Sequence, residues 1–102
     1  MALIQQMPYQ SVKADFGDGE IEIFYRPINL YEMDKIQCAR KVGDANALAE
    51  TLILRARDKT GDRIFDRAPD KDKILCQYDP HEVMRIATIL SGASDERPAG
   101  NG

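Results

Sequence analysis

The sequence predicts an α+β fold, in which an N-terminal β-hairpin is followed by about four short helices in one compact domain. Apolar and polar residues alternate on both sides of Gly17-Asp18-Gly19, as they do in a hairpin with one buried face. Downstream, apolar residues recur at helical spacing between cap and turn residues. A length of 102 residues favours one domain. We assign residues 1–10 to a flexible N-terminal arm, 11–92 to the domain and 93–102 to a disordered C-terminal tail.

The hairpin is predicted over residues 11–26. Its inward-facing residues are Val12, Ala14 and Phe16 on the first strand and Ile21, Ile23 and Tyr25 on the second. A two-stranded ribbon is marginally stable in water on its own. We therefore expect it to pack on the helices or to pair an edge with another chain.

The first helix is predicted from Leu30 to Lys41, with Asn29 as its N-cap and Gly43 just past its end. Apolar residues recur over a wide arc of this helix. One stripe is Leu30, Met33, Ile36 and Ala39, and a second is Tyr31, Cys38 and Val42.

The second helix is predicted from Ala45 to about Arg57, with Asp44 as its N-cap. Its buried stripe would be Ala45, Leu48, Ala49, Leu52, Ile53 and Ala56. Glu50, Arg55 and Arg57 fall outside this stripe, and we expect their side chains to be exposed to solvent. Leu54 falls off the stripe, so we expect it to be an exposed apolar residue.

A turn at residues 58–62 then leads to the apolar pair Ile64-Phe65. A short helix opens at Pro69-Asp70 and runs to about Gln77, with Ile74, Leu75 and Tyr78 on its apolar side. The next segment, Asp79-Pro80-His81-Glu82, has the pattern of an N-cap, an N1 proline and a glutamate able to reach back to the cap. The last helix buries Val83, Ile86, Ala87 and Leu90 and ends near Gly92.

Composition disfavours several function classes. A formal net charge of −3 argues against a general nucleic-acid binder. No apolar run approaches the ~18 residues of a membrane-spanning helix, and the first residues lack a signal-peptide pattern, so we expect the chain to remain in the cytoplasm. Cys38 and Cys76 have no C-x-x-C spacing, and we expect both to be free, buried thiols.

No pattern for catalysis, a cofactor or a metal is present. The chain has one histidine, and no phosphate-binding, nucleophile-elbow or zinc-protease motif. Alternating Asp58, Thr60 and Asp62 lack the later glutamate of a calcium loop. The last two helices could be taken for a helix-turn-helix, but the second offers Glu82, Arg85 and Thr88 rather than a basic recognition face.

Two segments together resemble the tail assembly chaperones of long-tailed bacteriophages. The first is the D-x-x-G-x-x-I-F pattern from Asp58 to Phe65, and the second is D-P-x-x-V-x-x-I from Asp79 to Ile86. The N-terminal run from Gly19 to Glu32, with its strand ending in Arg-Pro-apolar, also resembles that family. The resemblance implies structural roles in the turn and core for Gly61, Ile64, Phe65, Val83, Ile86 and Leu90.

The resemblance further implies a non-catalytic protein without cofactors, which binds the tape-measure protein and helps recruit tail tube subunits. Contact with the tail tube protein would come through a longer, frameshifted form. We expect such a protein in the host cytoplasm, absent from the mature virion, and self-associated through the hairpin edge or the first two helices. Tyr31, Leu54 and Met84 are the predicted partner-binding residues, because they lie off the main stripes. The alternatives are a head–tail junction adaptor and a small DNA-binding regulator.

Overall fold

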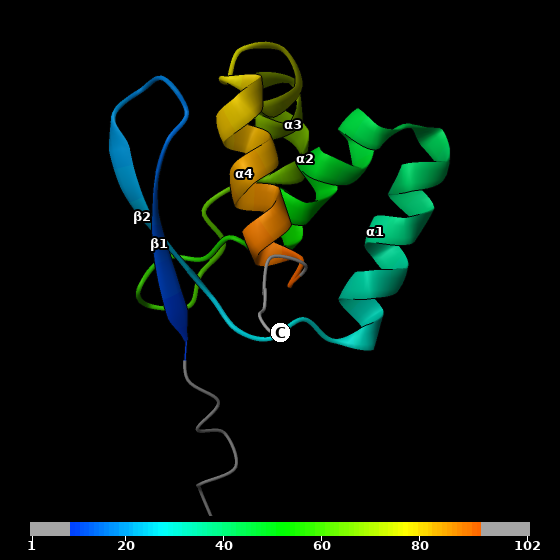
Figure 1. Ribbon diagram of the computed structural model, residues 1–102, viewed down its shortest axis with the longest axis horizontal. Helices are drawn as coiled ribbons and strands as arrows, with labels where there is room; N and C mark the ends of the chain where they lie inside the picture. Colours follow the sequence, from blue (N-terminus) through cyan, green and yellow to red (C-terminus); the bar gives the residue numbers. More distant parts are fainter. Residues whose placement is uncertain (1–8, 93–102) are drawn as a thin grey trace, which may run out of the picture.

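The computed structural model describes residues 9–92 of the chain. All of the predicted tail, residues 93–102, and all but two residues of the predicted arm, 1–10, lie outside this range. The elements in chain order are β1 (Gln10–Asp15), β2 (Glu20–Tyr25), α1 (Leu30–Val42), α2 (Asp44–Arg55), α3 (Arg67–Cys76) and α4 (Pro80–Leu90) (Figure 1). The predicted α+β fold, a hairpin followed by four helices, is confirmed.

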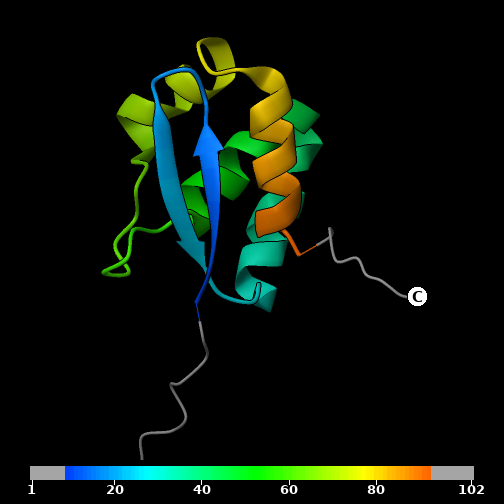
Figure 2. The same cartoon turned by 60° about the vertical axis from the view of Figure 1, so that its left-hand side comes forward.

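The hairpin buries one face against the helices, and α4 lies alongside it (Figure 2). In the antiparallel register Val12 pairs with Ile23, and Ala14 pairs with Ile21. Ala14 and Ile23 are fully buried. The turn between the strands uses the positive φ values of Gly17 and Gly19, +124° and +115°, which glycine adopts without steric strain.

Three aromatic rings join the hairpin to the second half of the chain. Phe16, which follows β1, stacks on Tyr78 with ring centroids 4.8 Å apart. Phe65 meets both of these rings edge-on at 6.1 Å. Phe65 is buried, and Ile64 is half-buried against the same core. Gly61, in the preceding turn, has a φ of +93°.

The core continues along α2 and α4. The helix α4 buries Val83, Ile86 and Leu90, the face that its spacing predicts. In α2 almost every residue from Ala47 onward is buried. This helix therefore runs through the middle of the domain, with α1 on one side and α3 and α4 on the other (Figure 1).

Both ends of α2 differ from the prediction, and α3 begins at Arg67, two residues before the predicted start at Pro69. Asp44 is the first residue of α2 and not its cap, because Gly43 takes the N-cap position. The helix α2 ends at Arg55, because Arg57 is extended and pairs with Phe24 at the outer edge of β2. Phe24 and Arg57 exchange two backbone hydrogen bonds of 2.7 and 3.0 Å.

Side chains of α4 cover the other edge of the hairpin. A carboxylate oxygen of Glu82 accepts from the backbone N–H of Asp15 at 3.0 Å, and Arg85 donates to the carbonyl of Lys13 at 2.9 Å. We call Glu82 and Arg85 the edge clamp. The prediction that Glu82 reaches back to the helix cap was wrong, because its carboxylate binds Arg85 and the β1 backbone instead. These hydrogen bonds lower the pKa of Glu82 to about 2.

A buried arginine connects four segments of the chain. Arg55 donates to the carbonyl of Leu90 at 2.7 Å, to the carbonyl of Arg26 at 2.6 Å and to the carboxylate of Glu32 at 2.9 Å. Burial lowers the pKa of the Arg55 guanidinium, an effect that the Glu32 carboxylate opposes. The prediction that Arg55 faces solvent was wrong, because α1 and the end of α4 both cover this face of α2.

The same correction applies to Glu50, which is buried although we expected it in solvent. Its carboxylate accepts two hydrogen bonds from the Arg67 guanidinium, one of them 2.7 Å long. These bonds lower the pKa of Glu50. Arg67, at the start of α3, thereby fixes that helix against α2.

Removing the Arg55 guanidinium should destabilise the fold strongly. In Arg55→Met the buried Glu32 carboxylate loses its partner ion, and two carbonyls lose their donor. Breaking a buried ion pair in this way costs about 3–5 kcal/mol. Urea unfolding measures the loss, with Arg40→Met on the exposed side of α1 as the control. A loss below about 1 kcal/mol, similar to that of a surface substitution, would contradict the assigned role.

The edge clamp should make stability depend on pH. Because folding lowers the pKa of Glu82 from 4.5 to about 2, its contribution is complete above about pH 4.5 and is lost as the pH falls toward 2. Glu82→Gln should therefore flatten this part of the curve of unfolding free energy against pH. Urea unfolding between pH 6 and 2.5 measures it, with the exposed Glu22→Gln as control. Equal slopes in the two variants would contradict the assignment.

Candidate protein-interaction surface

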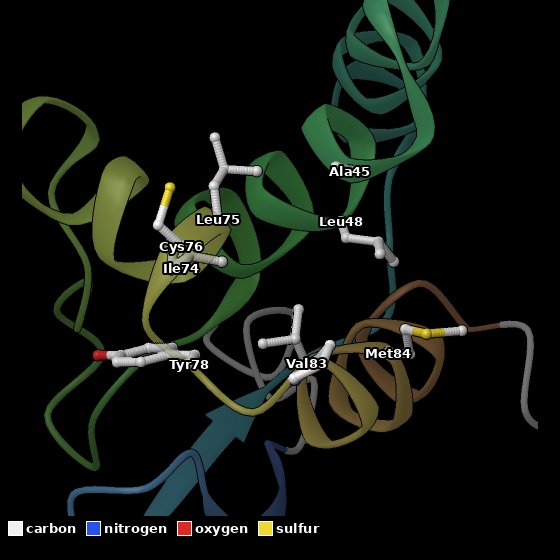
Figure 3. A pocket seen from close by; sticks show the side chains of 9 residues that line it. Ala45, Leu48, Ile74, Leu75, Cys76, Tyr78, Val83 and Met84 are labelled. Carbon is white, nitrogen blue, oxygen red and sulfur yellow. The ribbon is translucent and has the colours of Figure 1, made fainter.

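An apolar groove lies between α2, α3 and α4. Its volume is about 250 Å³. The side chains that shape it are Leu48, Ile74, Leu75, Tyr78, Val83 and Met84. Figure 3 shows Leu48 and Met84 on one side of the groove and Leu75, Cys76 and Tyr78 on the other. We refer to this surface as the α2–α3–α4 groove.

In both α3 and α4, a buried residue at the bottom of the groove is followed directly by an exposed residue at its edge. Ile74 and Val83 are each 4% exposed and form the floor. The next residue in each helix is rotated by about 100°, so that Leu75 and Met84 reach the surface at 39% and 52% exposure. Two flexible aliphatic side chains thus stand at the edge of a fixed apolar floor.

Tyr78 gives one end of the groove a rigid wall. Its ring is held by the stack on Phe16. Burial raises the pKa of its hydroxyl, and the carboxylates of Asp18 and Asp70 act in the same direction. The hydroxyl therefore stays neutral at physiological pH, and the groove presents an apolar surface and no ionised group from this residue.

Groupings typical of metal sites are lacking in the part of the chain that the structure describes. Within residues 9–92, no group of three His, Cys, Asp or Glu side chains could hold a metal ion. Nor does any described helix have the length and apolar composition needed to cross a membrane. The single histidine, His81, is exposed in the first turn of α4.

The structure separates the three predicted partner-binding residues. Met84 lies at the rim of the groove, whereas Tyr31 is 65% exposed on α1 and does not line it. The prediction that Leu54 is exposed was wrong, because it is 5% exposed and packs with Ile36 of α1 and Ala47. Helical spacing could not reveal this second buried side of α2, since α1 folds back over it.

Sequence reasoning missed the groove itself. Ala45 and Leu48, assigned to the buried stripe of α2, instead open onto the groove. One available signal was the adjacent pair Ile74-Leu75, because neighbouring residues of a short helix do not both fit one narrow buried stripe. The free thiols of Cys38 and Cys76 are exposed, so the prediction of buried thiols was also wrong.

The geometry of α4 does not favour a DNA-recognition helix. Arg85, the basic residue that would have to face the groove of DNA, is hydrogen-bonded to Glu82 and to the β1 backbone. That bonding fixes its guanidinium in place and offsets its charge. The remaining outward residues of the helix include Met84, His81 and Thr88, which line a shallow apolar surface.

Comparisons of the chain with known protein families, with curated proteins and with solved structures give no match. No residue role is therefore transferred from a relative.

Proposed function

We propose that this chain is a non-catalytic tail assembly chaperone of a long-tailed phage, which binds apolar helical segments of the tape-measure protein. The observation that carries the proposal is the α2–α3–α4 groove, an apolar surface with exposed Leu75 and Met84 at its rim. The sequence patterns around Gly61-Asp62-Arg63-Ile64-Phe65 and Asp79-Pro80 support it, since they resemble that family.

The physical properties of the groove suit a helical partner. An amphipathic helix inserts its apolar side chains into such a groove one turn at a time. Unbranched methionine adapts to different side-chain shapes, which suits a chaperone that meets successive segments of one long protein. Repeated weak contacts of this kind shield a long apolar partner without one deep pocket.

The wider role in this proposal follows from the resemblance. The chain would help to recruit tail tube subunits, with the tail tube protein bound by a longer, frameshifted form. It would act in the host cytoplasm and be absent from the mature virion. A head–tail junction adaptor, in contrast, would remain in the particle.

Charge placed at the groove rim should abolish partner binding. The chain is co-expressed with the tape-measure protein of the same phage, and co-purification and solubility of that protein are measured. Leu75→Asp and Met84→Asp should each lower the co-purified amount at least tenfold, because burying an aliphatic side chain contributes about 1.5–3 kcal/mol and 1.4 kcal/mol is tenfold in affinity. Met33→Asp is the matched control, since Met33 is an exposed helical methionine outside the groove.

Two results would contradict the proposal. One is a partner that stays insoluble and does not co-purify with the wild-type chain. The other is recovery of this chain in purified particles by mass spectrometry, as expected of the adaptor. Loss of binding in Met33→Asp but not in the rim variants would instead move the binding surface to α1.

A further inference from the structure

A second cavity lies at the end of the domain where β1 begins and α4 ends (Figure 2). Its volume is about 280 Å³. It shares no residue with the α2–α3–α4 groove, which opens at the start of α4. Two arginines, Arg26 and Arg55, line this cavity beside three apolar side chains, those of Pro27, Ile28 and Ile89. We call it the arginine pocket.

Arg55 gives the arginine pocket a guanidinium group that is held in place. The Arg55 side chain is 2% exposed. Within residues 9–92 it donates three hydrogen bonds, to the carbonyls of Arg26 and Leu90 and to the Glu32 carboxylate. A guanidinium has five N–H groups, so two remain for a further acceptor. Because three partners already fix the side chain, it would lose little conformational freedom on meeting a ligand.

Arg26 adds a second positive charge to the arginine pocket. Its side chain is half-buried, and among residues 9–92 it has neither a hydrogen-bond partner nor an ion-pair partner. The nearby carboxylate of Glu32 is bonded to Arg55. Besides burial, the positive charges of Arg26 and Arg57 lower the pKa of Arg55, because cations close together disfavour one another's charged form. Two guanidinium groups against one carboxylate leave an excess of one positive charge.

The remaining walls of the arginine pocket suit a small and partly apolar ligand. Ile28 and Ile89 are half-buried and present aliphatic side chains. Gln10 and Tyr25 contribute an amide and a hydroxyl group. The volume lies at the lower limit of the ~300–1,000 Å³ that is usual for pockets holding drug-sized molecules. The ligand is therefore smaller than such a molecule, and it needs one negative charge to match the excess of positive charge.

We propose that the arginine pocket binds a carboxylate carried on a short aliphatic chain. The carboxylate oxygens would accept hydrogen bonds from Arg26 and from the remaining N–H groups of Arg55, because guanidinium and carboxylate groups match in shape and charge. The aliphatic chain would lie on Ile28 and Ile89. These apolar walls and the single excess charge favour an organic monoanion over inorganic phosphate. A free short-chain acid and the C-terminus of a peptide both offer this chemistry.

Binding at this point would also stabilise the fold. Arg55 already connects the end of β2, the start of α1 and the end of α4. A carboxylate bound to the same guanidinium adds a further contact that only the folded chain offers, and such a ligand raises the melting temperature. The arginine pocket and the groove have separate walls, so this proposal does not depend on the proposed chaperone function.

Isoleucine methyl NMR of the full chain tests the site, because each cavity contains isoleucines of its own. Titration with hexanoate should shift the resonances of Ile28 and Ile89 in a saturable way in the millimolar range. The resonance of Ile74, on the floor of the groove, should stay unchanged. Hexylammonium, which has the same chain and the opposite charge, should shift none of them. N-acetylleucine, a model of a peptide C-terminus, separates the two sources: tighter binding than hexanoate assigns the pocket to a peptide, and weaker binding to a free acid.

Substitution of Arg26 tests the chemistry. Arg26→Gln should weaken hexanoate binding about tenfold, since it removes a charged hydrogen-bond donor. The variant keeps the backbone carbonyl that Arg55 binds, so it should unfold in urea like the wild type. Arg63→Gln is the matched control, because Arg63 is exposed and lies outside the pocket.

Three results would overturn the proposal. The first is a wild-type chain in which hexanoate causes no saturable shift at Ile28 and Ile89. The second is an equal response to hexylammonium, which would show that the carboxylate has no part in binding. The third is an Arg26→Gln variant that folds normally and binds hexanoate as tightly as the Arg63→Gln control.

Discussion

The fold depends on the placement of one guanidinium group, that of Arg55. It donates hydrogen bonds to the backbone carbonyl of Arg26, just after β2, and to the Glu32 carboxylate at the start of α1. It also donates to the carbonyl of Leu90, the last residue of α4. The planar donor fork of arginine can satisfy several acceptors at once. The start of α1, the end of α2 and the end of α4 are therefore fixed at one point, and buried polar groups that would otherwise cost free energy are paired.

This arrangement places α2 inside the domain and leaves two apolar surfaces outside it. On one side of α2, α1 covers Leu54 and leaves its own Tyr31 and Val42 exposed to solvent. On the other, α3 and α4 meet α2 without closing over Leu48 and Val83, and the groove results. Both surfaces follow from the packing of short helices around a central helix. A chain of this size then presents two exposed apolar surfaces on different sides of α2.

The sequence predicts well whatever depends on neighbouring residues. Gly17 and Gly19 mark the hairpin, Asn29 caps α1, and Asp79-Pro80 opens α4 as expected. Periodicity assumes one buried face per helix, and it fails for α2, which is buried on several sides. Leu54, Glu50 and Arg55 were therefore assigned to solvent although tertiary contacts bury them. The groove depends on how far apart α2, α3 and α4 lie, and no local sequence pattern specifies the distances between helices.

The proposed function places a helical segment of the tape-measure protein in the α2–α3–α4 groove. The most direct measurement is methyl NMR of the chain labelled at its methionines and titrated with a soluble fragment of that protein. We expect the Met84 resonance to shift or broaden at substoichiometric fragment. The Met33 resonance, from an exposed methionine outside the groove, should stay unchanged. A change confined to Met33, or no change in either resonance at saturating fragment, would contradict it.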